Sequence, residues 1–179
     1  MRKTIRKLFW GWDFDKEEKW LNEMSAKGLC LVSVGFCQYD FEPCLPGEYT
    51  IRMEFLDKLP GNPESEQYIK FIEDTGAQQV GSYGKWVYFR KNTADGDFEL
   101  FSDNSSRINH LKRILLFVGL ICGLNLYFAA YNFYLFAVFG NEISLLGALN
   151  LLLAVLSAYG FRRLNKKRKR LQAERQIYE

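Results

Sequence analysis

Two long apolar runs in the C-terminal half constrain this chain more than any other feature of its sequence. Residues 114–139 contain no charged side chain, and neither do residues 143–161. An α-helix needs about 20 apolar residues to cross the hydrocarbon core of a bilayer, so each run is long enough to span it. Only residues 140–142 separate the runs, which leaves room for a tight turn. The sequence therefore predicts a two-helix transmembrane hairpin.

Basic residues flank this hairpin at its two outer ends and not at its turn. Residues 107–113 and 162–179 are rich in Lys and Arg, whereas the only charged residue of the turn is Glu142. Lys and Arg close to the ends of a span favour the cytoplasmic side. We therefore expect a multi-pass protein of the inner (cytoplasmic) membrane with both termini in the cytoplasm. Four basic residues of the tail are expected to contact anionic lipid: Arg162, Arg163, Lys166 and Lys167.

Residues 1–106 are expected to form a domain outside the membrane, and this domain is acidic. It carries 13 Lys and Arg against 18 Asp and Glu, although the whole chain has a net charge of +3. The excess of basic charge therefore lies beside the membrane, and direct binding of nucleic acid is not expected. About one hundred residues suffice for one small domain with its own core.

The chain has four cysteines, and no two of them form a Cys-x-x-Cys pair: Cys30, Cys37, Cys44 and Cys122. In a reducing cytoplasm they are expected to be free thiols. The even spacing of the first three could suggest a metal site, but the only histidine, His110, lies next to the membrane. Ordinary packing is the stronger interpretation, so we expect no metal and no cofactor.

The sequence of the acidic part predicts an alternation of strands and helices. Strands are expected at residues 4–12, 29–41 and 48–56, and residues 78–83 and 85–91 are expected to form two short strands or one strand that is interrupted at Gly84. Helices are expected at residues 15–27 and 64–75, and residues 98–101 could add a short edge strand. Asp15 and Glu18 fit a capping box at the start of the first helix, and Asn62 fits an N-cap before Pro63 at the start of the second. The order βαββαβ predicts an α+β domain of the ferredoxin-like type, with two helices on one face of an antiparallel sheet.

The expected strands contain more aromatic side chains than two helices can cover. Six of them are candidates for a ligand or partner surface: Trp10, Trp12, Phe36, Tyr39, Trp86 and Tyr88. An exposed aromatic patch usually marks a binding site, which can also be a self-association surface. The alternative is a larger core in which loops cover the rings. The sequence leaves both interpretations open.

Several short motifs of this region have a distinctive composition and spacing. They are Phe9-Trp10-Gly11-Trp12, the segment Glu18-x-Trp20-Leu21 that leads to Gly28, Trp86-x-Tyr88-Phe89-Arg90-Lys91, and Leu100-Phe101-Ser102-Asp103. Together they resemble a bacterial family of membrane proteins of unknown function, DUF2812, over about residues 7–108. Ala77 departs from the family pattern, which usually has Trp after the glycine. The family supplies no catalytic residues. Its members are often encoded beside PadR-type winged-helix repressors, which implies a membrane-linked regulatory role.

Residues that could carry catalysis are sparse. The carboxylate pairs Glu17/Glu18 and Glu73/Asp74 are expected to be solvated charges on helix surfaces, and His110 is too close to the membrane to serve a pocket of the domain. The chain has no glycine-rich phosphate-binding loop. We therefore expect that it is not an enzyme.

A polar run that includes Ser102, Asp103 and Ser105 precedes the first apolar run. Its simplest role is to cap the helix that enters the membrane. The functional alternative is a hinge that passes a change in the domain to the membrane helices. The residue types do not separate the two roles.

Four residues inside the apolar runs are candidates for helix packing: Gly119, Gly123, Asn132 and Asn150. Asn132 and Asn150 are expected at similar depth on antiparallel helices, where they could form a hydrogen bond across the hairpin. Gly119 and Gly123 form a GxxxG pattern on another helix face. We expect that face to contact another chain, as in a homodimer.

These features favour a non-enzymatic sensing or adaptor module that is tethered to the membrane. Its expected partners are anionic lipid and a cytoplasmic protein, for which the family resemblance suggests a PadR-type transcription regulator. The rival hypothesis is an accessory or docking subunit of a larger membrane transporter or envelope complex. A small-molecule site on the aromatic face of the sheet is compatible with either.

Overall fold

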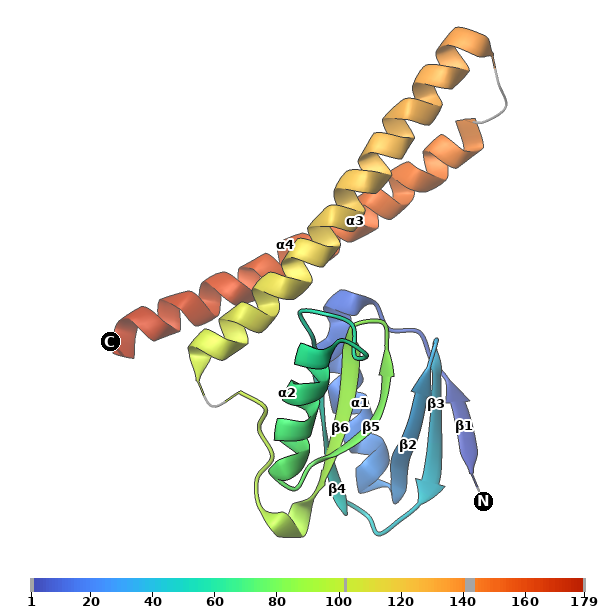
Figure 1. Cartoon of the computed structure of the whole chain (residues 1–179). Coiled ribbons are helices and arrows are strands. Elements are labelled where there is room, and N and C mark those ends of the chain that lie inside the picture. The colour runs from blue at the N-terminus through green and yellow to red at the C-terminus, as the bar shows by residue number, and fades with distance from the viewer. Residues whose placement is uncertain (1, 102, 141–143, 179) are drawn as a thin grey trace. The chain divides into compact units, whose positions relative to one another are not determined.

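The computed structural model describes residues 2–101, 103–140 and 144–178, and the chain divides into two units (Figure 1). The first unit spans Met1–Asp103 and the second spans Asn104–Glu179. Within the described residues, the first unit contains all of the β-strands, and the second consists of two long helices.

The first unit is built from two consecutive halves, and each half runs strand, helix, strand, strand. The first half contains β1 (Lys3–Arg6), α1 (Phe14–Ala26), β2 (Leu29–Gly35) and β3 (Gln38–Pro43). The second half contains β4 (Tyr49–Phe55), α2 (Pro63–Asp74), β5 (Gln78–Tyr83) and β6 (Trp86–Asn92). Short 3-10 turns at Gly11–Asp13 and Thr93–Asp95 precede α1 and follow β6.

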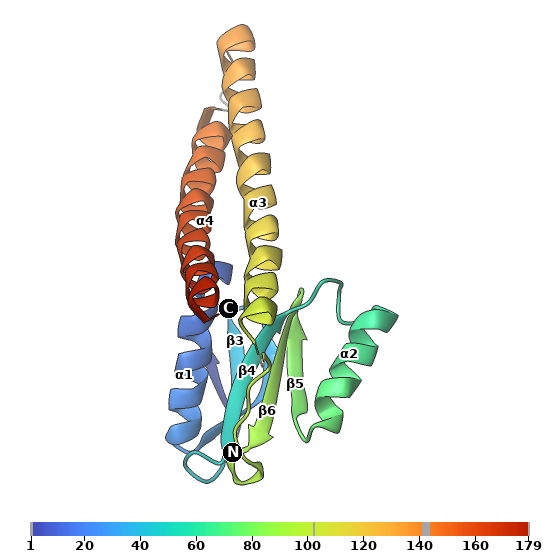
Figure 2. The same ribbon diagram turned by 90° about the vertical axis from the view of Figure 1, so that its left-hand side faces the viewer.

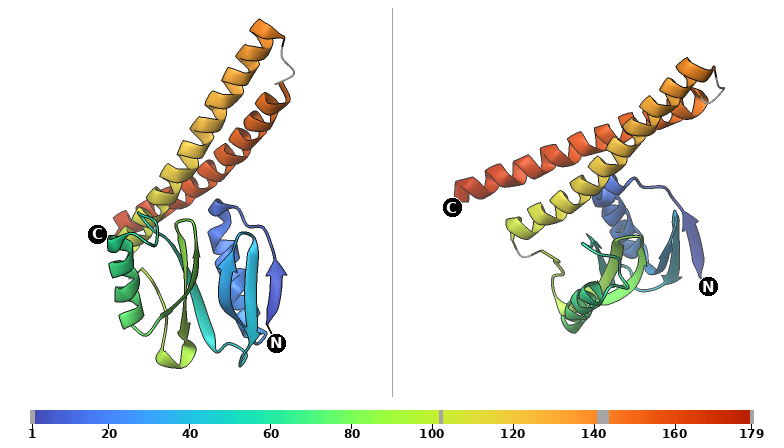
Figure 3. Two further views of the ribbon diagram at one scale, coloured as in Figure 1. Left: turned by 45° about the vertical axis from the view of Figure 1, so that its right-hand side comes forward. Right: turned by 45° about the horizontal axis from the view of Figure 1, so that its top comes forward.

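Each half forms its own antiparallel sheet with the same strand order. The first sheet has the order β1-β3-β2 and the second has the order β4-β6-β5. The two sheets are seen most clearly in the left view of Figure 3. They meet where β2 lies beside β5, and there Nη1 of Arg90 donates a 3.0 Å hydrogen bond to the backbone carbonyl of Leu31. The first unit is therefore a structural duplication.

Equivalent residues of the two halves keep a constant spacing along the chain. Gly28 and Gly76 follow α1 and α2 with φ values of +77° and +88°, and they are 48 positions apart. Both glycines end a helix in the left-handed region, where a side chain would be strained. Phe41 and Phe89 are fully buried on the central strands β3 and β6, again 48 positions apart. Each half thus ends its helix and fills its core at matching positions.

The α+β class is confirmed, whereas the predicted ferredoxin-like βαββαβ order is not. The segment Leu29–Phe41, expected to be one strand, is divided at Phe36 and Cys37 into β2 and β3. Cys37 has a φ of +52°, so the chain turns there without the glycine, asparagine or proline that marks most turns. The additional strand produces two sheets of three strands in place of one continuous sheet. The first strand is also shorter than expected and ends at Arg6.

The two helices of the first unit begin in different ways. At the start of α2, Asn62 accepts a 3.1 Å hydrogen bond from the backbone N–H of Glu64, and Pro63 follows it, as predicted. At the start of α1, the N-cap is Asp13 and no side chain makes a capping hydrogen bond. The predicted capping box of Asp15 and Glu18 is therefore wrong.

One edge of β4 is covered by α1 through polar side chains on successive helical turns. Three side chains pair with the backbone of alternate strand residues: Glu18 with Met53, Asn22 with Ile51, and Ser25 with Tyr49. Asn22 makes two of these bonds, both 2.9 Å long: its Nδ2 donates to the carbonyl of Ile51, and its Oδ1 accepts from the N–H of Ile51. The other edge of β4 pairs with β6, so both of its edges are satisfied within the unit.

Cys30 and Cys44 are joined by a disulfide, with their Cα atoms 5.8 Å apart. The structure therefore differs from the prediction of free thiols for this pair, whereas Cys37 and Cys122 are free. The pair meets because the N–H of Cys44 donates a 3.0 Å hydrogen bond to the carbonyl of Gly28, at the start of β2.

In the described part of the chain, one group of side chains could hold a metal ion. It consists of the same two cysteines and Glu48. The ligand atoms of Cys30, Cys44 and Glu48 lie within 4.8 Å of one another. A metal ion binds cysteine as the thiolate. In the disulfide form that the structure shows, both sulfurs are consumed and the group offers such an ion only the carboxylate.

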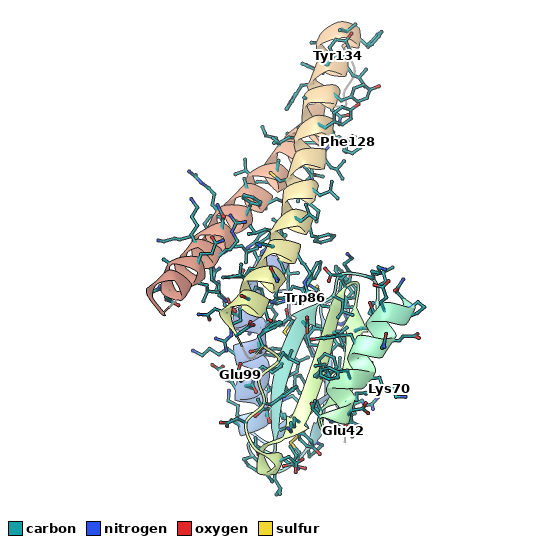
Figure 4. All side chains as sticks on the ribbon, turned by 60° about the vertical axis from the view of Figure 1, so that its left-hand side comes forward. Glu42, Lys70, Trp86, Glu99, Phe128 and Tyr134 are labelled. Carbon is teal, nitrogen blue, oxygen red and sulfur yellow. A yellow bond between two sulfur atoms is a disulfide. The ribbon has the colours of Figure 1, made fainter. Side chains whose placement is uncertain are left out.

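The second unit is an antiparallel pair of helices, α3 (Asn104–Phe139) and α4 (Ser144–Tyr178), seen side by side in Figure 2. Both helices are long and apolar enough to cross a membrane, judged by length and composition. The basic segments 107–113 and 162–170 continue the same helices beyond the apolar runs. Aromatic side chains such as Phe128 and Tyr134 are exposed along α3 (Figure 4).

Candidate functional site

A buried carboxylate, that of Glu17 on α1, connects the two sheets of the first unit. Its Oε1 accepts a 2.6 Å hydrogen bond from the hydroxyl of Tyr39 on β3 and another of 2.6 Å from the hydroxyl of Tyr88 on β6. Glu17 is only 6% exposed, and both tyrosines are buried. Because one hydroxyl comes from each sheet, the carboxylate ties the two halves together.

The inward position of Glu17 follows from the apolar face of α1. Phe14, Leu21 and Met24 are buried on this helix, and Glu17 lies between them at helical spacings of three and four residues. The prediction that Glu17 is a solvated surface charge is therefore wrong, and so is the same prediction for Glu18, which bonds to β4. Its place within the apolar stripe is the sequence signal that could have identified Glu17.

Burial governs the protonation of this site. The loss of solvent raises the pKa of Glu17 above its ordinary value, while the hydrogen bonds from Tyr39 and Tyr88 act in the opposite direction. Burial also raises the pKa of both tyrosines, and the nearby Glu17 carboxylate raises it further. The two hydroxyls therefore stay protonated and act as donors. In the described residues, no Lys, Arg or His forms an ion pair with Glu17.

The raised pKa makes the stability of the first unit depend on pH with a defined sign. Between the ordinary and the raised pKa of Glu17, the folded chain holds a proton that the unfolded chain has lost. The Glu17 contribution therefore lowers the free energy of unfolding as pH rises through that window. We expect Glu17→Gln to remove this contribution, so denaturant unfolding from pH 4.5 to 7.5 should show a weaker loss of stability in the variant. The raised pKa of Glu18 acts with the same sign in both proteins and cancels in the comparison. Identical pH profiles would contradict the prediction.

Aromatic rings lead from this carboxylate to the surface. The ring of Tyr39 packs edge-on against Trp20, with centroids 5.1 Å apart, and against Phe9 at 6.3 Å. Phe9 and Trp20 are half-buried, and the ammonium Nζ of exposed Lys7 lies over both rings, at 4.8 Å and 4.5 Å from their centroids. We call Phe9, Trp20 and Tyr39 the aromatic cluster. Its inner end touches Glu17 through the Tyr39 hydroxyl, and its outer end holds a cation.

The sequence around this site matches a known family. A family model described as a protein of unknown function (DUF2812) covers residues 13–122. The chain belongs to the DUF2812 family. The DUF2812 region contains Glu17, Tyr39 and Tyr88 and extends into α3. No curated protein and no solved structure matches the chain.

The aromatic residues proposed from the sequence are divided between the interior and the surface of the DUF2812 chain. Tyr39 and Tyr88 come together at Glu17 and are buried. Trp10 and Trp12 stack with their ring centroids 5.0 Å apart; Trp10 is 41% exposed and Trp12 is buried. Of these four, Trp10 alone presents a large exposed ring.

The other two proposed aromatic residues lie elsewhere. Phe36, in the turn between β2 and β3, is 72% exposed and lies 5.6 Å from the ring of Tyr83. Trp86, labelled in Figure 4, is half-buried and packs against Phe14 and Phe55. The six rings therefore lie in different environments. Among them, Tyr39 and Tyr88 bond to the Glu17 carboxylate.

The proposed hinge lies at the boundary between the two units. Ser102 lies outside the described residues, Asp103 is the last residue of the first unit, and Ser105 lies in the first turn of α3. Because α3 begins at Asn104, Ser105 does not occupy the N-cap position. The hinge role stays a prediction.

The glycines of α3 differ in their surroundings. A Cβ added at Gly119 would lie 3.3 Å from the ring of Phe161 on α4, so Gly119 faces the inside of the helix pair. Gly119 therefore packs within the helix pair, and its expected contact with another chain stays a prediction. A Cβ added at Gly123 would meet nothing within 4 Å, and a contact there with another chain stays a prediction.

The predicted hydrogen bond between Asn132 and Asn150 is not formed in the described residues. Nδ2 of Asn132 donates a 2.7 Å hydrogen bond to the carbonyl of Phe128 in its own helix. Asn132 nevertheless faces α4, because a Cβ added at Gly147 would lie 3.3 Å from the Cβ of Asn132. The small residue Gly147 thus permits close helix approach, while Asn132 satisfies its amide locally.

The four basic residues proposed to contact lipid lie on the C-terminal part of α4. Arg162 and Lys166 are exposed, whereas Arg163 and Lys167 are half-buried. Contact of these side chains with lipid stays a prediction.

Proposed function

We propose that this DUF2812 chain is a non-enzymatic, membrane-tethered sensing module. Its first unit would bind a small molecule and pass its state to a protein partner. The observation that carries the proposal is the contact of Glu17 with Tyr39 and Tyr88. Since these hydroxyls come from different sheets, a ligand that binds the carboxylate would change its charge state and thereby the strength of the bonds that hold the two halves together. A binding event at one point would thereby change the whole unit.

The membrane anchor is the second part of the proposal. We propose that α3 and α4 cross the inner membrane as a hairpin, with both termini in the cytoplasm. The basic segments 107–113 and 162–170 support this orientation, since the turn at residues 140–142 has no Lys or Arg. In a reducing cytoplasm the Cys30–Cys44 pair would be held as thiols and would close under oxidising conditions.

The test is affinity purification of the full chain from native membranes in mild detergent, followed by mass spectrometry of the co-purifying proteins. We expect a DNA-binding regulator of the PadR type in a fixed ratio, which would also place the first unit in the cytoplasm. Glu17→Gln should change the amount of regulator recovered, whereas Glu23→Gln, on the exposed face of the same helix, should not. A transporter or envelope complex in fixed ratio would overturn the proposal in favour of an accessory subunit. Recovery of the chain alone would also contradict it.

A further inference from the structure

We infer that the Glu17 site binds a small organic cation, an ammonium group carried on an apolar or aromatic body. This inference names the ligand class of the proposed sensing site. It rests on the proposed function for the consequence of binding, and on the geometry of the site for binding itself.

The charge balance of the site calls for a cation. Glu17 is almost fully buried, and in the described residues it has no Lys, Arg or His partner. The hydroxyls of Tyr39 and Tyr88 donate hydrogen bonds but bring no positive charge. An ionised carboxylate that is removed from water without a counter-charge is costly. A ligand that carries a positive charge would offset that cost, and the offset would contribute to the free energy of binding.

The carboxylate also keeps one oxygen available. Both tyrosine hydroxyls bond to Oε1 of Glu17, and Oε2 has no hydrogen-bond partner in the described residues. Oε2 is also not among the polar side-chain atoms that are sealed from solvent without a partner. An N–H group could therefore bond to Oε2 without displacing Tyr39 or Tyr88. Charge-assisted bonds of this kind are among the strongest that a protein forms.

The aromatic cluster supplies a surface for the rest of the ligand. Trp20 lies three residues after Glu17 on the same helix, and its ring packs against Tyr39. At the outer end of the cluster, the chain's own ammonium, that of Lys7, lies over the rings of Phe9 and Trp20. Lys7 thus shows that these rings accept a cation. In the proposed complex the apolar body of the ligand competes with Lys7 for this face, and its ammonium group bonds to Oε2 of Glu17.

A divalent metal ion is a poorer fit to the same residues. Mg²⁺ and Ca²⁺ take six or more oxygen ligands, several of them commonly carboxylates. The site offers one carboxylate and two neutral hydroxyls, and Glu17 does not belong to the metal-competent group in the described residues. An organic cation needs only one carboxylate and the aromatic rings that are present.

The experiment measures binding of phenethylamine to the purified full chain in detergent, by calorimetry and by tryptophan fluorescence. The matched neutral ligand is 2-phenylethanol, which has a similar body but no charge. We expect phenethylamine to bind at least about tenfold more tightly than 2-phenylethanol, because a hydrogen bond to a charged group is the stronger kind. Glu17→Gln should weaken phenethylamine binding at least about tenfold, and Lys7→Gln should strengthen it. Glu23→Gln should leave it unchanged.

Equal affinity for the two ligands, or an unchanged affinity after Glu17→Gln in a variant that still unfolds cooperatively, would overturn the inference. If Glu17→Gln does not fold, the two-ligand comparison and the Lys7→Gln variant decide the question alone. If phenethylamine binds as expected but no regulator co-purifies with the chain, the proposed function is refuted and the cation site is supported. A co-purifying regulator with no Glu17-dependent binding would refute this inference alone.

Discussion

Reduction of the Cys30–Cys44 disulfide is expected to lower the free energy of unfolding of the first unit by about 3 kcal/mol. The two cysteines are 14 positions apart, and cross-linking a loop of about 15 residues removes conformational entropy from the unfolded state, which raises its free energy by about that much. The folded state should survive reduction, because the hydrogen bond from the Cys44 N–H to Gly28 does not depend on the sulfurs. Reduction is therefore expected to destabilise the unit without changing its fold.

The measurement is chemical unfolding of the full chain in detergent, with and without reductant. A Cys30→Ala/Cys44→Ala variant should match the reduced wild type and should not respond to reductant. Cys37→Ala is the matched control: Cys37 is a free thiol, so this variant should keep the full response. If complete reduction leaves the wild-type stability unchanged, the bond does not restrain the unfolded chain and the prediction fails.

The features that could be predicted from the sequence depend on neighbouring residues. The two uncharged runs predict long helices, because length and composition alone decide whether a helix can span a bilayer. The start of α2 is predicted by Asn62 and Pro63, since a cap and the first turn lie within three positions. The clean alternation of Tyr49–Phe55 likewise predicts β4. In each case the deciding interaction is local.

The division into two sheets could not be predicted in the same way. The turn that separates β2 from β3 contains Phe36 and Cys37, which are not typical turn residues, so the segment reads as one long strand. The duplication also leaves few matching residues in the sequence. The glycines after the two helices recur 48 positions apart, but Leu31 of the first half corresponds to Gln79 of the second. A repeat of only two copies with such differences gives little sequence signal.

The candidate site is not evident from the sequence because its parts are distant in the chain. The sequence makes Tyr39 and Tyr88 candidates for a binding surface, but only the fold shows that they converge on one carboxylate. Glu17 lies 22 positions from Tyr39 and 71 from Tyr88. The disulfide has the same cause: sequence spacing does not determine whether two cysteines approach within bonding distance. Contacts that depend on how strands pair are therefore accessible only once the topology is known.

The second large effect is expected from Asn22→Leu, which should lower the free energy of unfolding by about 2–4 kcal/mol. Asn22 is the only described side chain that bonds to both the N–H and the carbonyl of Ile51, and Ile51 is fully buried. Leucine would leave the Ile51 N–H without its partner and the Ile51 carbonyl with only the 3.3 Å bond from Nη1 of Arg52. A buried backbone group without a partner costs about 1–3 kcal/mol, and the lost bond to the carbonyl adds to that cost. Glu23→Ala, on the exposed face of the same helix, should change stability by no more than about 0.5 kcal/mol.

Asn22→Asp separates the two bonds, because aspartate can still accept from the Ile51 N–H but cannot donate to its carbonyl. Asn22→Asp should therefore unfold at a denaturant concentration between those of the wild type and Asn22→Leu, with all three proteins in the same detergent. Asn22 also holds α1 in register on β4, and Glu17 lies five residues earlier on that helix. If α1 is held by Asn22, the leucine variant should lose the Glu17 contribution to the pH profile along with stability. A leucine variant as stable as wild type would mean that packing of the apolar face alone fixes the helix that presents the carboxylate.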